Sequence, residues 1–213
     1  MYRLRIRYRQ QTTLNSCWWA ALGMLLEYHT ERTYAFPSDY HASFRPPPGH
    51  FGTLQYNAPP NHLALLMGEN EPWQWYYQGI EPDLLNVNRL ANISGMRPLE
   101  ATTGRSTFGG GPAVSLDAAW MEDMLREFGP IYIIRRHAQG HHAFLISGVL
   151  QRTGGRDGRG LIEIKDPWPP FGDGQTMQMS GLQSQLAPQL RAFNMLVLRD
   201  RRATPRVAEQ GEG

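Results

Sequence analysis

Apolar and charged side chains alternate strictly along the first residues of the chain. The apolar set is Tyr2, Leu4, Ile6 and Tyr8, and the charged set is Arg3, Arg5, Arg7 and Arg9. Because successive side chains of a strand point to opposite faces, this alternation predicts a half-buried strand over residues 2–8. The arginines then form its solvent face, and a basic ridge for an anionic partner is the alternative interpretation.

Apolar residues next recur at the spacing of a helix. Ser16 is a candidate N-cap for a helix predicted from about Cys17 to His29. A second helix is predicted from Pro82 through about Ile93, with Gly95 as its stop. A third is predicted from Ser115, with Asp117 close behind, to Phe128. Shorter elements are a helix over 61–67 and a strand over 97–101.

Strands follow one another in the second half of the chain. They are predicted at about 131–136, 142–150, 160–166 and 193–198, with a short helix near 182–186. The turn-rich residues 153–158 join two of these strands into an antiparallel hairpin. The sequence therefore predicts an α+β fold, in which a helical half packs against an antiparallel sheet or half-barrel and leaves a cleft between the halves.

Other segments carry little periodicity. Residues 34–60 are rich in Pro, Gly and His, residues 102–115 are rich in Gly, and both are expected to form irregular loops that line the cleft. The aromatic cluster at 73–77 is expected in a core or an interface. At 213 residues and 41% hydrophobic, the chain predicts a single domain over 1–199 and a disordered tail over 200–213.

Composition narrows the classes of partner. The formal net charge is only +2, no nucleic-acid motif accompanies the arginines, and no apolar run approaches the length of a membrane span. Met1 is not followed by an apolar signal-peptide core, and one cysteine forms no internal disulfide. We expect a monomer that binds neither nucleic acid nor membrane and keeps a free thiol.

That single cysteine, Cys17, stands where the strand-like segment gives way to the first helix. The positive end of a helix macrodipole favours the reactive thiolate, so this is a place for a nucleophile. The alternative is a small buried hydrophobic residue without chemistry.

Two downstream residues complete a candidate catalytic triad. His142 opens one strand of the predicted hairpin and Asp166 ends the other, so they are expected to lie side by side as base and orienting group. The Cys17 N–H and the Gln11 side chain are candidate oxyanion donors. Gln10 is the alternative to Gln11 if the turn is displaced by one residue, and His141 is the alternative to His142.

A metal site is a further alternative. The three histidines His137, His141 and His142 cluster in sequence, but adjacent residues of a strand point to opposite faces and no second cysteine is present. We expect neither a metal nor a cofactor.

These motifs together resemble the papain-like cysteine peptidases. The resemblance rests on Gln11, Cys17-Trp18, His142-Ala143 and Asp166-Pro167-Trp168, and it covers about residues 5–198. It is closest to the effector cysteine proteases of bacterial plant pathogens and the peptidase domains of bacteriocin exporters. It implies a papain-like fold with a central nucleophile helix and an endopeptidase that cleaves a protein substrate through a Cys17 acyl-enzyme.

The resemblance also implies a biological setting. The chain is expected to be a bacterial toxin or effector, held in the producer's cytoplasm with a cognate immunity protein and delivered to a target cell by a machine that needs no signal peptide. A housekeeping or maturation protease is the alternative setting. Alternative activities are deamidation, transglutamination or acyl transfer on the same scaffold, and an inactive binding module is the alternative outside enzymes.

Overall fold

A computed structural model describes residues 1–11, 16–30, 84–99, 116–137, 140–153, 160–168, 173–186 and 194–198. This part of the chain contains the helices α1 (Cys17–Thr30), α4 (Leu84–Ser94), α6 (Ala118–Phe128) and α7 (Met179–Gln185). Its strands are β1 (Tyr2–Arg3), β2 (Met96–Pro98), β3 (Ile131–His137), β4 (Gly140–Gln151), β5 (Leu161–Lys165), β6 (Gln175–Gln178) and β7 (Met195–Leu198). The predictions for 34–60, 61–67, 73–77, 102–115 and 200–213 fall outside the described residues.

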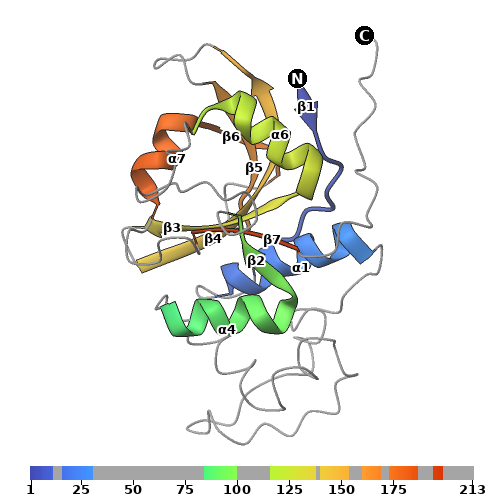
Figure 1. Cartoon of the computed structure of the whole chain (residues 1–213), viewed down its shortest axis with the longest axis vertical. Coiled ribbons are helices and arrows are strands. Elements are labelled where there is room, and N and C mark those ends of the chain that lie inside the picture. Colours follow the sequence, from blue (N-terminus) through green and yellow to red (C-terminus); the bar gives the residue numbers. More distant parts are fainter. Residues whose placement is uncertain are drawn as a thin grey trace, which may run out of the picture.

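All seven strands belong to one antiparallel sheet (Figure 1). The strand order is β2-β7-β3-β4-β5-β6, and β1 pairs with the far end of β4. β5 occupies one edge of the long strand β4, so β3 and β1 must share the other edge in succession. The register of β4 with β5 shifts between Ile146 and Gly148 and again between Val149 and Gln151. Such bulges bend and twist a strand.

Helices pack on both faces of this sheet, which makes the described fold α+β. α1 contacts β3 and β4, and Figure 1 shows it below the strands together with α4, which packs against β2. In the same view α6 and α7 lie above β3, β4 and β7. α6 packs against β4, and α7 packs against β3 and β6.

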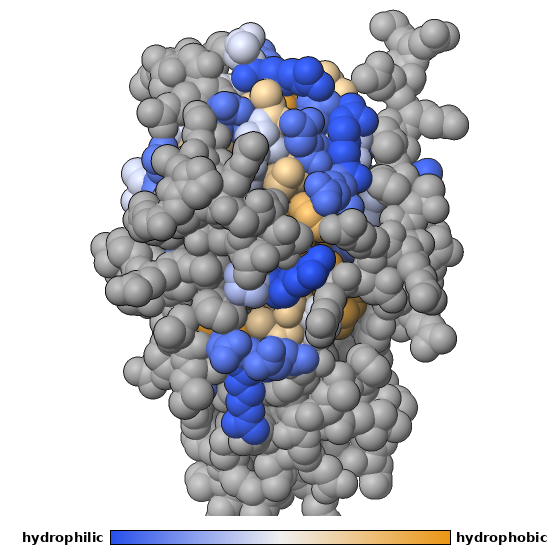
Figure 2. Space-filling view, viewed as in Figure 1, coloured by the Kyte–Doolittle hydropathy of each residue, from blue (hydrophilic) through white to orange (hydrophobic). Residues whose placement is uncertain are grey.

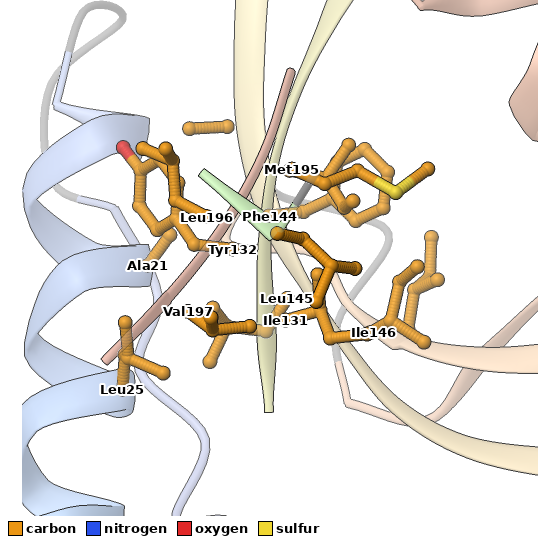
Figure 3. Close-up of a cluster of buried hydrophobic side chains, with 14 of the residues drawn as sticks. Ala21, Leu25, Ile131, Tyr132, Phe144, Leu145, Ile146, Met195, Leu196 and Val197 are labelled. Atoms are coloured by element: carbon orange, nitrogen blue, oxygen red, sulfur yellow. The ribbon is translucent and has the colours of Figure 1, made fainter. Parts of the chain in front are cut away.

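The core forms where α1 meets the sheet (Figure 3). Ala21 and Leu25 on α1 face Tyr132, Leu196 and Val197 on the adjacent strands, and all five are at most 1% exposed. Among the described residues, the terminal methionine is the only large hydrophobic residue that is exposed. The described part of the surface seen in Figure 2 is mostly hydrophilic over α6 and the strands beside it.

The main elements lie close to their predicted ranges. α1 begins at Cys17, and β3, β4 and β5 cover the three predicted strands within one or two residues at almost every end. The sequence interpretation placed the start of α6 at Ser115, whereas the N-cap is Asp117, whose Oδ1 accepts a hydrogen bond from the Trp120 N–H at 2.8 Å. Gly129 ends this helix with a φ of 78°, a conformation that glycine adopts without steric strain.

The prediction of one strand over residues 2–8 is wrong in extent. The burial alternation continues through Ile6, but the ladder is limited to β1, followed by a Leu4 N–H to Ser147 carbonyl hydrogen bond of 2.8 Å. The reason is steric, because β3 already occupies this edge of β4 from Gly140 to Ile146. Strand β6 was missed, since its residues Gln175–Gln178 lack an apolar alternation.

Candidate active site

Cys17 is the first residue of α1, and the surrounding backbone holds it there. The Ser16 carbonyl accepts hydrogen bonds from the N–H groups of Trp19 and Ala20, both at 3.1 Å, as expected of an N-cap residue. From the sheet, the buried Tyr132 hydroxyl donates to the Trp18 carbonyl at 3.3 Å. Cys17 is 8% exposed, so its sulfur is largely buried. The hydrogen bond from Tyr132 ties the first turn of α1 to the sheet.

His142 and Asp166 lie side by side, as the hairpin prediction requires. His142 is the third residue of β4, and Asp166 comes directly after β5. The His142 Nε2 and the Asp166 Oδ1 are 2.6 Å apart, and the same oxygen accepts the Trp168 N–H at 2.9 Å. The two side chains are 5% and 0% exposed, so the pair is shielded from water.

The environment of His142 favours its protonated form. Burial lowers the pKa of His142, but hydrogen bonds with Asp166 and with the Cys17 thiol, and the negative charge of both partners, outweigh it and raise the pKa from 6.5 to about 9. Because Nε2 faces Asp166, Nδ1 is the ring nitrogen left for the Cys17 sulfur. The imidazole is thus hydrogen-bonded to the carboxylate and coupled electrostatically to the sulfur, and the three groups form one series.

Asp166 remains ionised although it is fully buried. Burial raises its pKa, but the His142 hydrogen bond and charge, the Trp168 N–H and the Arg135 charge outweigh burial, so the pKa lies below the ordinary value. Arg135 reaches the second carboxylate oxygen, with 3.2 Å between its Nη2 and the Asp166 Oδ2. A buried carboxylate with donors on both oxygens is held in one rotation about its Cβ–Cγ bond.

The N-terminal arm is fastened to the turn that follows β5. The Gln11 N–H donates to the Pro167 carbonyl at 2.9 Å, and the Tyr8 hydroxyl donates to the Asp166 carbonyl at 3.0 Å. Burial and the negative charges of Asp166 and Asp173 raise the pKa of Tyr8, so this hydroxyl keeps its proton at neutral pH. Gln11 is 6% exposed, whereas Gln10 is exposed. The arm therefore brings Gln11, rather than its neighbour, next to the turn that carries the carboxylate.

No protein-family model and no curated protein matches this chain. Its chemistry is therefore argued from the side chains themselves. Within the described residues, no cluster of three or more His, Cys, Asp or Glu side chains is arranged to hold a metal ion. None of the helices there is long and apolar enough to cross a membrane.

Sequence reasoning missed two residues beside this site. Arg135 follows the four apolar residues that open β3, stands before Arg136 and His137, and is the cross-strand neighbour of His142. Tyr132 lies three residues before it on the same strand. Because alternate residues of a strand share a face, Arg135 shares one with Ile131 and Ile133, and this was a usable signal that its charge needs a buried partner. The identity of that partner depends on the register of β3 with β4.

Proposed function

We propose that the protein is a cysteine endopeptidase of the papain-like type that attacks peptide bonds through a Cys17 acyl-enzyme. The single observation that carries the proposal is the buried His142–Asp166 hydrogen bond, together with Cys17 at the start of α1, whose side chain helps to raise the pKa of His142. A nucleophile, a base within hydrogen-bond reach and a group that orients the base are the parts that acyl transfer by a thiol requires.

The steps of the reaction follow from this series. The Cys17 sulfur, its proton transferred to His142, attacks the carbonyl carbon of the substrate and forms the C–S bond. The His142 imidazolium then gives its proton to the leaving nitrogen as the C–N bond breaks. A water molecule, deprotonated by the same imidazole, breaks the C–S bond of the acyl-enzyme and releases the acid. The raised pKa of His142, about 9, favours the proton-carrying form that the leaving group needs at neutral pH.

The oxyanion of each tetrahedral intermediate needs donors that carry no titrating charge. The Cys17 backbone N–H at the start of α1 and the Gln11 side-chain amide have this chemistry. The hydrogen bond that fastens Gln11 to the Pro167 carbonyl supports this role, because it links the arm to the turn that carries Asp166.

A comparison of wild type with Cys17→Ala tests the proposal. Each protein is incubated with a cell lysate, and new peptide N-termini are identified by mass spectrometry. We expect new N-termini with the wild type and none with the variant. Cleavage that persists in Cys17→Ala would sink the proposal. Mass shifts without new termini would favour deamidation, transglutamination or acyl transfer instead.

The same proposal includes the setting in which the enzyme acts. We propose a bacterial toxin or effector that is delivered into a target cell and neutralised in the producer by an immunity protein. Support comes only from the motif series around Cys17, His142 and Asp166. The wild type is expected to inhibit growth when expressed in a target cell, and Cys17→Ala is expected to be harmless. Equal growth of the two strains would contradict this setting.

A further inference from the structure

We propose that Arg135 is a positioning residue of the active site, which fixes the Asp166 carboxylate and keeps it ionised so that His142 stays aligned with Cys17. The inference rests on the proposed function only for the role of the thiol. Arg135 itself touches neither Cys17 nor His142 through a hydrogen bond described here, so it acts through the carboxylate.

The two oxygens of the Asp166 carboxylate have different partners. Oδ1 serves His142 and the Trp168 N–H, whereas Oδ2 receives the Arg135 guanidinium at 3.2 Å. If Oδ2 lost its donor, the carboxylate could turn and present either oxygen to the imidazole. The guanidinium thus removes a rotational freedom of the group that orients the base.

Arg135 is itself held by three contacts. Its Nη1 donates to the Gln185 Oε1 at 2.8 Å, at the end of α7. Its guanidinium carbon lies 4.9 Å from the centre of the Phe144 ring, and that ring stacks on His142 with 6.4 Å between the ring centres. The backbone of Arg135 also forms an antiparallel bridge with Leu186. A side chain fixed so fully can impose a position on its partner.

The charges of Arg135 and Asp166 attract each other where little water reaches them. The Arg135 side chain is 12% exposed and Asp166 is fully buried, so solvent screens their interaction weakly. The Arg135 charge is one of the causes that keep the pKa of Asp166 below its ordinary value. Burial lowers the pKa of Arg135 as well, and the Asp166 charge opposes that change.

The other titratable groups around Asp166 act in known directions. His142 on β4 faces the carboxylate directly and lowers its pKa, while Cys17 on α1 is coupled to it through the imidazole. Tyr8 on the N-terminal arm meets only the main-chain carbonyl of Asp166. Among the described groups that face it, Arg135 is the only cation besides the imidazolium. A change at Arg135 should therefore be visible as a change in the titration of Asp166.

The test measures the rate at which iodoacetamide alkylates Cys17 between pH 3 and pH 8, followed by intact mass. In Arg135→Gln the carboxylate becomes protonated at higher pH, so we expect the acid limb of the rate profile to move up by about one pH unit. Arg135→Lys keeps a cation beside the carboxylate and is expected to restore the wild-type limb. Arg152→Gln is the matched control, because Arg152 pairs with the buried Glu122 away from this site.

A second variant keeps the inference testable if Arg135→Gln fails to fold. Gln185→Glu is isosteric and places a competing carboxylate on the guanidinium, so it should also move the acid limb up, by about half a pH unit. If Arg135 had only a structural role, the new ion pair in Gln185→Glu would stabilise the fold. The acid limb of the rate profile would then stay where it is in the wild type. An unmoved limb in folded Arg135→Gln, or in Gln185→Glu, overturns the inference. Alkylation needs no peptide substrate, so a wild type that alkylates normally but cleaves nothing would count against the proposed function alone.

Discussion

Replacing Asp166 with asparagine should lower the pKa of His142 and the stability of the fold together. Asp166→Asn keeps the size and one acceptor oxygen of the side chain, but it removes the charge that faces both the imidazolium and Arg135. The rise in the His142 pKa from 6.5 to about 9 corresponds to about 3 kcal/mol of preference for the protonated form, at about 1.4 kcal/mol for each pH unit. Asp166 and Cys17 both contribute to this rise in the His142 pKa. We therefore expect Asp166→Asn to lose about half of the rise or more.

The sign of the pH dependence follows from the direction of the pKa change. The folded pKa of His142 lies above the unfolded value, so its stabilising contribution is fully present below about pH 6.5 and disappears as the pH rises through about 9. At pH 6 the variant should be less stable than wild type by about 2–4 kcal/mol, because a buried charge partner is lost. The gap should narrow at pH 10, where the imidazole is neutral in both proteins.

Two measurements check this prediction. NMR titration of the histidine ring signals, with His142 assigned from a His142→Gln spectrum, gives its pKa in wild type and in Asp166→Asn. Urea unfolding at pH 6 and pH 10 gives the free energies. Cys17→Ala is the matched variant, because its His142 pKa shows how much of the rise is due to the thiol. A His142 that titrates at or below 6.5 in the wild type, or that keeps a pKa of about 9 in Asp166→Asn, would contradict this prediction.

Two further predictions concern the fold. Glu122 accepts hydrogen bonds from Arg152 and a neighbouring arginine, and these bonds are the main cause that lowers its pKa to about 2, so its contribution is present above about pH 4.5 and lost as the pH falls. Glu122→Gln should therefore cost about 1–2 kcal/mol in urea unfolding at pH 7, allowing for the exposed arginines, and less than half of that at pH 3; equal losses at both would contradict this. A Cβ on Gly148 would lie 2.7 Å from the Tyr2 carbonyl oxygen, so Gly148→Ala should lose about 1–3 kcal/mol. Its matched control, Gly181→Ala on α7, has no described atom nearer than 3.9 Å and should lose nothing.

The sequence was informative about the site because its chemistry is tied to element ends. A helix start, a strand start and a strand end are visible as Ser16-Cys17, Gly140-His141-His142 and Lys165-Asp166-Pro167. The short turn between two antiparallel strands then requires the start of one to lie beside the end of the other. For these reasons the pairing of His142 with Asp166 was predictable without any distance.

Contacts that depend on register across the sheet were not predictable in this way. Arg135 meets Asp166 only because β3 pairs with β4 so that Arg135 is opposite His142. A shift of that register by one residue would turn Arg135 to the other face of the sheet. Tyr132 supports the first turn of α1 for a similar reason, since helix and strand are more than one hundred residues apart in the chain.

The length of the first strand also depends on pairing across the sheet, which the sequence pattern does not show. Alternation correctly gave the buried face through Ile6, but it did not reveal that β3 already occupies the edge on which a longer β1 would pair. At any position, one edge of a strand can pair with only one other segment. Which segment pairs there therefore depends on the topology of the whole sheet. Strand β6 shows the opposite situation. Its residues Gln175–Gln178 have no apolar alternation of their own, yet they pair with β5 at the edge of the sheet.

The α+β class, the main elements and the order of the candidate residues Cys17, His142 and Asp166 could be predicted from the chain alone. These depend on local periodicity and on where elements begin and end, which neighbouring residues decide. Only the tertiary structure decided the protonation of His142, the second donor on Asp166 and the attachment of Gln11 to the turn after β5. Those depend on burial and on charges that meet across strands, and both arise only when distant segments are packed together.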